Sequence, residues 1–212
     1  MFKLFLFLFF LTAPAMAQGK ELTAEEQKLV GKIEAYFNSI KTIKSKFYQV
    51  SDNGGSAQGT FYVSKPDRMR LTYEPPYPVE VIADGHYLIF HDKKLEQVTY
   101  LDLDENPAAM ILKNDFSFKK EGLTITDMTT ESGLVTVSVI KKSVPSAGKI
   151  TLIFNDAPLT LRQWRVTDAR QITTLVTLDN METNITVDSQ LFKFKDPRKK
   201  QRPGDIPDRR KK

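Results

Sequence analysis

The chain of 212 residues has no cysteine, a single tryptophan and only two histidines. The missing cysteine excludes disulfide staples, thiolate metal sites and thiol nucleophiles. His86 and His91 lie five residues apart in one expected strand, so they point to opposite faces of a sheet. They therefore cannot share a metal or catalytic centre, and we interpret both as polar residues on a solvated strand or at a turn.

Long hydrophobic runs are also missing. The longest apolar run covers residues 4–11, too short for a helix that must cross a hydrocarbon core of about 30 Å. It follows Lys3 and is followed by Pro14 and the small-residue end Ala15-Met16-Ala17, a pattern typical of a secretory signal peptide. We therefore expect residues 1–17 to be a signal peptide rather than a membrane anchor. Cleavage before Gln18 would leave an exported protein without a lipid-attachment cysteine.

The net charge of +5 is not spread along the chain. Residues 198–212 hold eight Lys and Arg against two Asp, which leaves residues 18–197 with 22 Lys and Arg against 24 Asp and Glu. A body with a slight negative charge argues against a nucleic-acid partner. Because residues 198–212 contain one apolar residue, Ile206, we expect a basic disordered tail after a single domain at 18–197.

Motifs for catalysis and for cofactors are lacking as well. No Gly-x-Ser-x-Gly elbow occurs, and Ser143 stands where the first glycine of a phosphate loop before Gly148 is required. Most carboxylates, such as Asp84 and Asp168, lie in turns, where they bond the turn backbone. Asp102, Asp104 and Glu105 could hold a hard cation, but negative charge before a helix N-terminus explains them more simply. We expect no enzyme activity, metal or cofactor.

One helix and many strands follow from the periodicity. Thr23 and Glu26 form a capping box, and apolar residues repeat every three or four positions, which predicts a helix over 23–41. Asn106 and Pro107 open a short apolar helix that ends at Leu112. Runs with period two predict eleven strands: 43–50, 57–64, 68–74, 79–83, 86–91, 95–101, 122–128, 134–141, 149–155, 159–167 and 171–181.

Short links between strands require an antiparallel sheet, and a sheet with one apolar face must curl around a cover. The fold class is therefore a mainly β, curled antiparallel half-barrel, covered by the N-terminal helix and a short lid helix. The apolar faces either form an ordinary β core or enclose a ligand cavity. The candidate lipid-binding residues are Phe47, Phe61, Val63, Met69, Leu71, Tyr73, Leu88, Phe90, Met110, Ile111, Leu112, Leu152, Phe154 and Trp164.

Several segments resemble a known family. They read GTFYVSKPDRMRLTYEPP at 59–76, VIADGHYL at 81–88, EQVT at 96–99, NP at 106–107, LRQWRVTD at 161–168, and FKF at 192–194 before DP at 196–197. The chain resembles the periplasmic outer-membrane lipoprotein carrier proteins, the LolA family. This resemblance implies an unclosed eleven-stranded barrel with helices as a lid over a hydrophobic cavity. The implied partners are acylated lipoproteins, an inner-membrane ABC-type exporter and an outer-membrane lipoprotein acceptor, and we expect a monomer.

Two positions depart from the family pattern. Lys65 stands where many members have an arginine that bonds the lid, and Leu71 stands where an aromatic is frequent. Lysine lacks the planar fork of arginine, so we predict a lid latch made by Lys65, by Arg70, or by both. Since the same fold can serve other uses, a periplasmic lipid-sensing regulatory module is the alternative function. An enzyme acting on lipid ranks third.

Overall fold

The computed structural model describes residues 19–104, 107–143 and 148–198. The expected signal peptide, Asn106, Glu105 and residues 199–212 lie outside this part. Helix α1 runs over Ala24–Ser39 and begins with the predicted capping box. The Thr23 hydroxyl accepts the Glu26 N–H, and the Glu26 carboxylate accepts the Thr23 N–H. The reciprocal bonds satisfy two backbone groups that a helix start leaves free.

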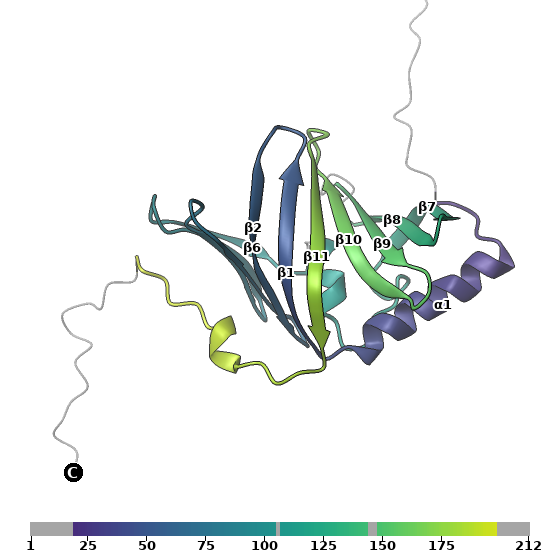
Figure 1. The fold of residues 1–212 in the computed structure, drawn as a ribbon, viewed down its shortest axis with the longest axis horizontal. Coiled ribbons are helices and arrows are strands. Elements are labelled where there is room, and N and C mark those ends of the chain that lie inside the picture. The colour runs from purple at the N-terminus through teal and green to yellow at the C-terminus, as the bar shows by residue number, and fades with distance from the viewer. Residues whose placement is uncertain (1–18, 105–106, 144–147, 199–212) are drawn as a thin grey trace, which may run out of the picture.

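The eleven predicted strands are all present and form one antiparallel sheet. They are β1 (Thr42–Ser51), β2 (Ser56–Ser64), β3 (Arg68–Tyr73), β4 (Val79–Asp84), β5 (Tyr87–Asp92), β6 (Gln97–Asp102), β7 (Leu123–Glu131), β8 (Leu134–Lys141), β9 (Lys149–Asn155), β10 (Thr160–Thr167) and β11 (Thr173–Thr183). The order is β6-β5-β4-β3-β2-β1-β11-β10-β9-β8-β7. The first strand, β1, therefore pairs with the last strand, β11, at the centre of the sheet. The predicted half-barrel is confirmed (Figure 1).

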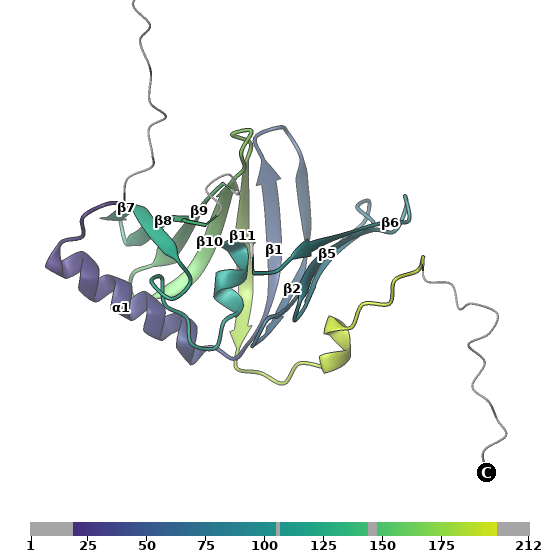
Figure 2. The same ribbon diagram turned by 180° about the vertical axis from the view of Figure 1, so that it is seen from behind.

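Two helices cover the concave side of the curled sheet (Figure 2). The α1 residues Tyr36 and Phe37 pack edge-on against Phe154 of β9, with ring centroids 5.9 and 5.8 Å apart. The short helix η1 (Pro107–Leu112) is a 3-10 helix rather than an α-helix. Because α1 lies over the β9 half of the sheet, the β2–β5 half is left for η1 to cover.

The convex side of β4 to β6 has a cover that the sequence did not predict. After β11 the chain forms the 3-10 helix η3 (Ser189–Phe192) and continues along this side. Phe194 packs against a small apolar cluster of Ile82, Ile89 and Val98. Arg198, which we expected in the disordered tail, instead donates to the Val98 carbonyl at 3.0 Å. We call residues 189–198 the C-terminal arm.

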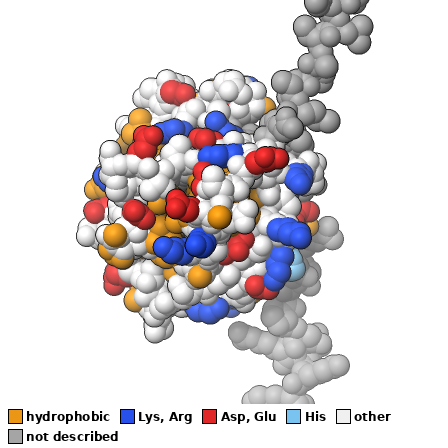
Figure 3. All heavy atoms as spheres, turned by 90° about the vertical axis from the view of Figure 1, so that its right-hand side faces the viewer, with side chains coloured by type: hydrophobic (Ala, Val, Ile, Leu, Met, Phe, Trp, Pro, Cys, Tyr) orange, Lys and Arg blue, Asp and Glu red, His pale blue; other side chains and the backbone are white. Residues whose placement is uncertain are grey.

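Side chains of both charges are scattered over the side of the molecule where α1 and β7 lie (Figure 3). Within the described ranges, every helix is too short or too polar to cross a lipid bilayer.

Candidate functional site

An apolar cavity of about 250 Å³ lies on the concave side of the sheet. One wall comes from β2 to β5, the facing wall from β9 and β10, and η1 covers the space between them. The lining residues are Phe61, Met69, Leu71, Tyr73, Val81, Leu88, Phe90, Met110, Ile111, Ile150, Leu152, Leu161, Trp164 and Val166. Nearly all of these side chains are hydrocarbon, so the cavity can enclose an apolar chain but offers it few hydrogen-bonding partners.

Most of the predicted lipid-binding residues line this cavity. The exceptions are Phe47, Val63, Leu112 and Phe154, whose side chains are fully buried in the core. Four further lining residues were absent from our candidate set: Val81, Ile150, Leu161 and Val166. The signal that identifies them is the same alternation of apolar residues in β4, β9 and β10.

Aromatic side chains define the inside and the opening of the cavity. Phe61 of β2 and Trp164 of β10 bring the two walls together, with ring centroids 5.4 Å apart. Phe90 of β5 lines the cavity, yet 38% of its surface is exposed. The other lining residues are buried or half-buried, so Phe90 marks the mouth of the cavity.

The lid helix is tied to the turn between β2 and β3. The Asp67 N–H donates to the Leu112 carbonyl at 3.0 Å, and Lys113 Nζ lies 3.1 Å from the Asp67 carboxylate. Lys113 also lies 2.9 Å from Asp104, so this acidic residue pairs with a lysine. These contacts close η1 over the cavity and must break before η1 can move outward.

Comparison with known proteins agrees with this geometry. The family model of the outer membrane lipoprotein carrier protein LolA matches residues 38–195, which span the sheet, η1 and most of the C-terminal arm. The chain belongs to the LolA family.

Named relatives are similar over most of their length. The outer-membrane lipoprotein carrier protein of Methylococcus capsulatus is 27% identical over 199 residues, which cover 90% of this chain and 94% of the relative. That of Dechloromonas aromatica is 28% identical over 178 residues, which cover 79% and 84%. A crystal structure of a DUF1329 family protein from Desulfovibrio piger superposes with a TM-score of 0.52 at 7% identity, covering 80% and 96% of the two chains. That similarity concerns the fold alone.

In this LolA family member, Lys65 bonds a helix end, though not that of η1. Its Nζ donates to the Phe37 carbonyl in the last turn of α1 at 2.6 Å. Burial, together with the smaller effect of the nearby Lys41 charge, lowers the pKa of Lys65 to about 8. Lys65 therefore fastens α1, while its neighbour Asp67 in the same turn fastens η1.

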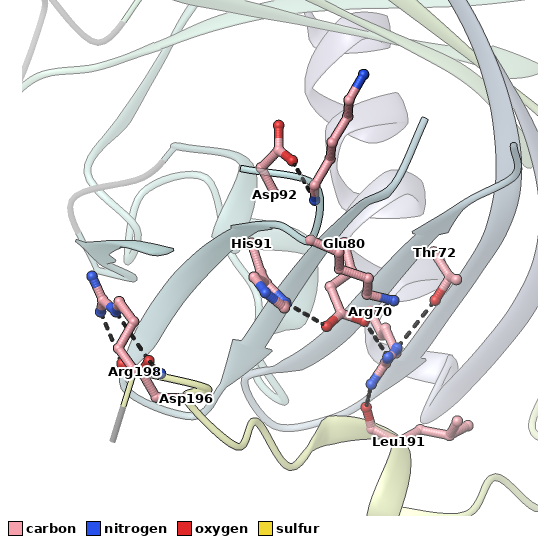
Figure 4. A network of polar contacts seen from close by, with 10 residues as sticks. Arg70, Thr72, Glu80, His91, Asp92, Leu191, Asp196 and Arg198 are labelled. Atoms are coloured by element: carbon pink, nitrogen blue, oxygen red, sulfur yellow. Dashed lines mark hydrogen bonds and ion pairs between the residues drawn. The ribbon is translucent and has the colours of Figure 1, made fainter. Parts of the chain in front are cut away.

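Arg70 lies on the opposite face of the sheet from the cavity, so the prediction that it latches the lid is wrong. Its guanidinium pairs with Glu80 and donates to the Leu191 carbonyl of the C-terminal arm at 2.9 Å (Figure 4). His91 Nδ1 lies 3.0 Å from the other Glu80 oxygen, with only 12% of the His91 side chain exposed. His91 is therefore a member of a half-buried network, which corrects its interpretation as a solvated residue.

Burial alone would raise the pKa of Glu80, but contacts with His91, Arg70 and Lys93 outweigh it and hold that pKa below the usual value. The network is thus built around an ionised carboxylate. The partners of this carboxylate come from β3, from β5 and from Lys93, which follows β5, and Arg70 connects the network to the arm. This side of the sheet is structural, whereas the concave side carries the cavity.

Proposed function

We propose that this protein is a periplasmic carrier that binds the acyl chains of lipoproteins in the concave cavity and moves lipoproteins from the inner to the outer membrane. The observation that supports this proposal is the apolar cavity beneath η1, in a chain of the LolA family. The role is that of a monomeric binding protein rather than an enzyme. Its partners are an inner-membrane ABC-type exporter that supplies the cargo and an outer-membrane acceptor that receives it.

The size of the cavity supports a lid that moves. Pockets that enclose drug-sized ligands measure roughly 300–1,000 Å³, and this one holds about 250 Å³. A long acyl chain therefore needs more room than the closed form provides. Movement of η1 away from Asp67 supplies that room and breaks the contacts to Leu112 and Lys113.

The lid contacts also make release possible. Each buried methylene contributes about 0.8 kcal/mol, so a preformed cavity that enclosed a whole acyl chain would hold it almost irreversibly. A closed empty state reduces the net affinity by the free energy needed to open the lid. The same free energy is recovered when the cargo leaves and η1 closes again.

The proposal is tested by extraction of cargo from membranes. Purified protein is incubated with energised inner-membrane vesicles that contain an exporter and an acylated lipoprotein, and the soluble fraction is separated by size. We expect the lipoprotein to leave the vesicles in a one-to-one complex, and its non-acylated form to make no complex. Recovery of free lipid together with a stably bound partner protein, without lipoprotein, would instead support the sensing module.

A further inference from the structure

A second pocket, of about 450 Å³, adjoins the apolar cavity at Tyr73. It lies between the tips of the β1–β2 and β10–β11 hairpins and the link from β3 to β4. Its lining mixes polar and apolar groups and is far more polar than that of the apolar cavity; the lining residues are Gln49, Ser51, Asn53, Gly55, Ser56, Ala57, Tyr73, Tyr77, Val79, Asp168, Arg170, Ile172 and Thr174. The concave face therefore carries an apolar compartment and a polar compartment side by side.

Tyr73 forms the boundary between the two compartments, because it lines both. Its ring packs edge-on against Phe47, with centroids 5.1 Å apart, and its hydroxyl donates to Gln49 Oε1 at 2.8 Å. Both rings lie on strands that pair with Gly59, where a Cβ would come within 2.8 Å of the Phe47 ring. The glycine allows this close packing, and the packing fixes the Tyr73 ring toward one compartment and its hydroxyl toward the other.

The chemistry of the polar pocket favours an uncharged ligand. The NH2 groups of Gln49 and Asn53 and the hydroxyls of Ser56 and Thr174 can donate to carbonyl oxygens, and the two hydroxyls can also accept from N–H groups. The Asn53 side-chain oxygen already accepts the Gly55 N–H, and the Ser51 hydroxyl donates to the Thr173 carbonyl. The two charged lining residues, Asp168 and Arg170, pair with each other at 3.4 Å. Asp168 also accepts the backbone N–H groups of Arg170 and Ile172, so its charge serves its own turn.

An acylated protein terminus has the same two-part chemistry. Its acyl chains are hydrocarbon, and the groups that join them to the peptide are neutral esters and amides. We propose that the pocket beyond Tyr73 binds this ester and amide junction of the cargo while the acyl chains lie in the apolar cavity. This inference rests on the proposed function and adds the part of the cargo that the pocket recognises. A carrier built in this way distinguishes acylated peptides from plain hydrocarbon.

The test compares two probes on purified protein: a synthetic diacylated lipopeptide, which has the junction, and diphenylhexatriene, a hydrocarbon fluorophore without it. Gln49→Leu removes the amide beside Tyr73, and Thr174→Val removes a hydroxyl at nearly constant shape. We expect each variant to weaken lipopeptide binding roughly two- to tenfold, the range of one hydrogen bond, with unchanged affinity for diphenylhexatriene. Gln163→Leu is the matched control, since Gln163 bonds Thr177 at 2.9 Å and lies outside both pockets.

Each remaining outcome overturns a specific statement. Unchanged lipopeptide affinity in both variants would overturn the junction site and leave the acyl carrier intact. Equal loss of both probes would show that these residues only support the cavity, which also overturns the junction site. A wild-type protein that binds neither probe would overturn the proposed function itself.

Discussion

The Nζ atom of Lys65 lies 2.6 Å from the carbonyl oxygen of Phe37, which joins the β2–β3 turn to the end of α1. Two residues further on, the Asp67 N–H bonds the Leu112 carbonyl at the end of η1. One turn thus holds both helices that cover the concave face. Displacement of this turn would loosen the two covers together, which makes it the natural place to control the opening of the cavity.

The buried Lys65 amine makes stability depend on pH in the alkaline range. Its pKa is about 8 in the folded protein and 10.5 when exposed, so between these values the unfolded chain binds more protons. The free energy of unfolding should therefore rise with pH from about 8 to 10.5 relative to Lys65→Leu. We expect a gain on the order of 2 kcal/mol, less than the full shift gives because the amine keeps some solvent contact.

Urea denaturation of both proteins at several pH values measures this difference and removes the contribution of other titrating groups. Lys28→Leu is the control, because Lys28 is exposed on the same helix that Lys65 contacts. Parallel pH profiles for wild type and Lys65→Leu would show that the amine keeps its ordinary pKa in the folded state.

The lid should open more easily without Lys113. Lys113→Met removes both ion pairs, to Asp67 and Asp104, that hold the end of η1. The lost contacts favour the open form, so acyl-probe affinity should rise roughly five- to fifty-fold and delivery to acceptor membranes should slow. Faster hydrogen exchange at the amides of η1 would report the opening directly.

Lys120→Met is the control for this substitution. It removes an exposed ion pair with Asp115 in the segment that follows η1. Tighter binding in both variants would mean that loss of positive charge, rather than release of η1, raises the affinity.

The mouth of the cavity can be tested with two aromatic residues of one strand. Phe90 and Tyr87 are both partly exposed, at 38% and 48%, but only Phe90 lines the cavity. Phe90→Glu places an unpaired charge where acyl chains enter and should weaken an acyl probe roughly ten- to hundredfold. Tyr87→Glu should leave affinity near that of wild type, as measured by fluorescence titration. Equal losses would indicate that β5 supports folding and not binding.

Local periodicity predicted the walls of the cavity well. In a strand, alternate residues share a face, so Met69 and Leu71 could be assigned to the wall from the sequence alone. The same alternation assigns Arg70 to the other face, and this geometry excludes it from a lid that covers the concave side. The family motif placed the arginine near the latch, but strand geometry decides where it points.

Contacts between distant segments explain what the sequence could not reveal. Phe154 has the alternation of a wall residue, yet α1 crosses it and places Tyr36 and Phe37 against its ring. The path of the C-terminal arm is likewise set by Phe194 meeting residues of β4 to β6, more than ninety positions away in the sequence. No local pattern records which face such a segment covers.

Protonation of Glu80 should weaken the convex face in acid. The Glu80 side chain is 7% exposed and pairs with Arg70, His91 and Lys93, and its pKa is held below 4.5. As the pH falls, the unfolded chain therefore binds a proton before the folded protein does, so the stabilisation is present above pH 4.5 and is lost as pH falls through the folded pKa.

Glu80→Gln should cost about 1–3 kcal/mol at pH 7, because it leaves Arg70 without its charged partner. The difference from wild type should shrink below pH 4.5 in denaturation experiments. Acyl-probe affinity at pH 7 should stay the same, since the network and the cavity lie on opposite faces of the sheet. Glu182→Gln, at a carboxylate that is 57% exposed, is the control. A pH-independent difference between wild type and Glu80→Gln would show that the folded network does not hold Glu80 ionised.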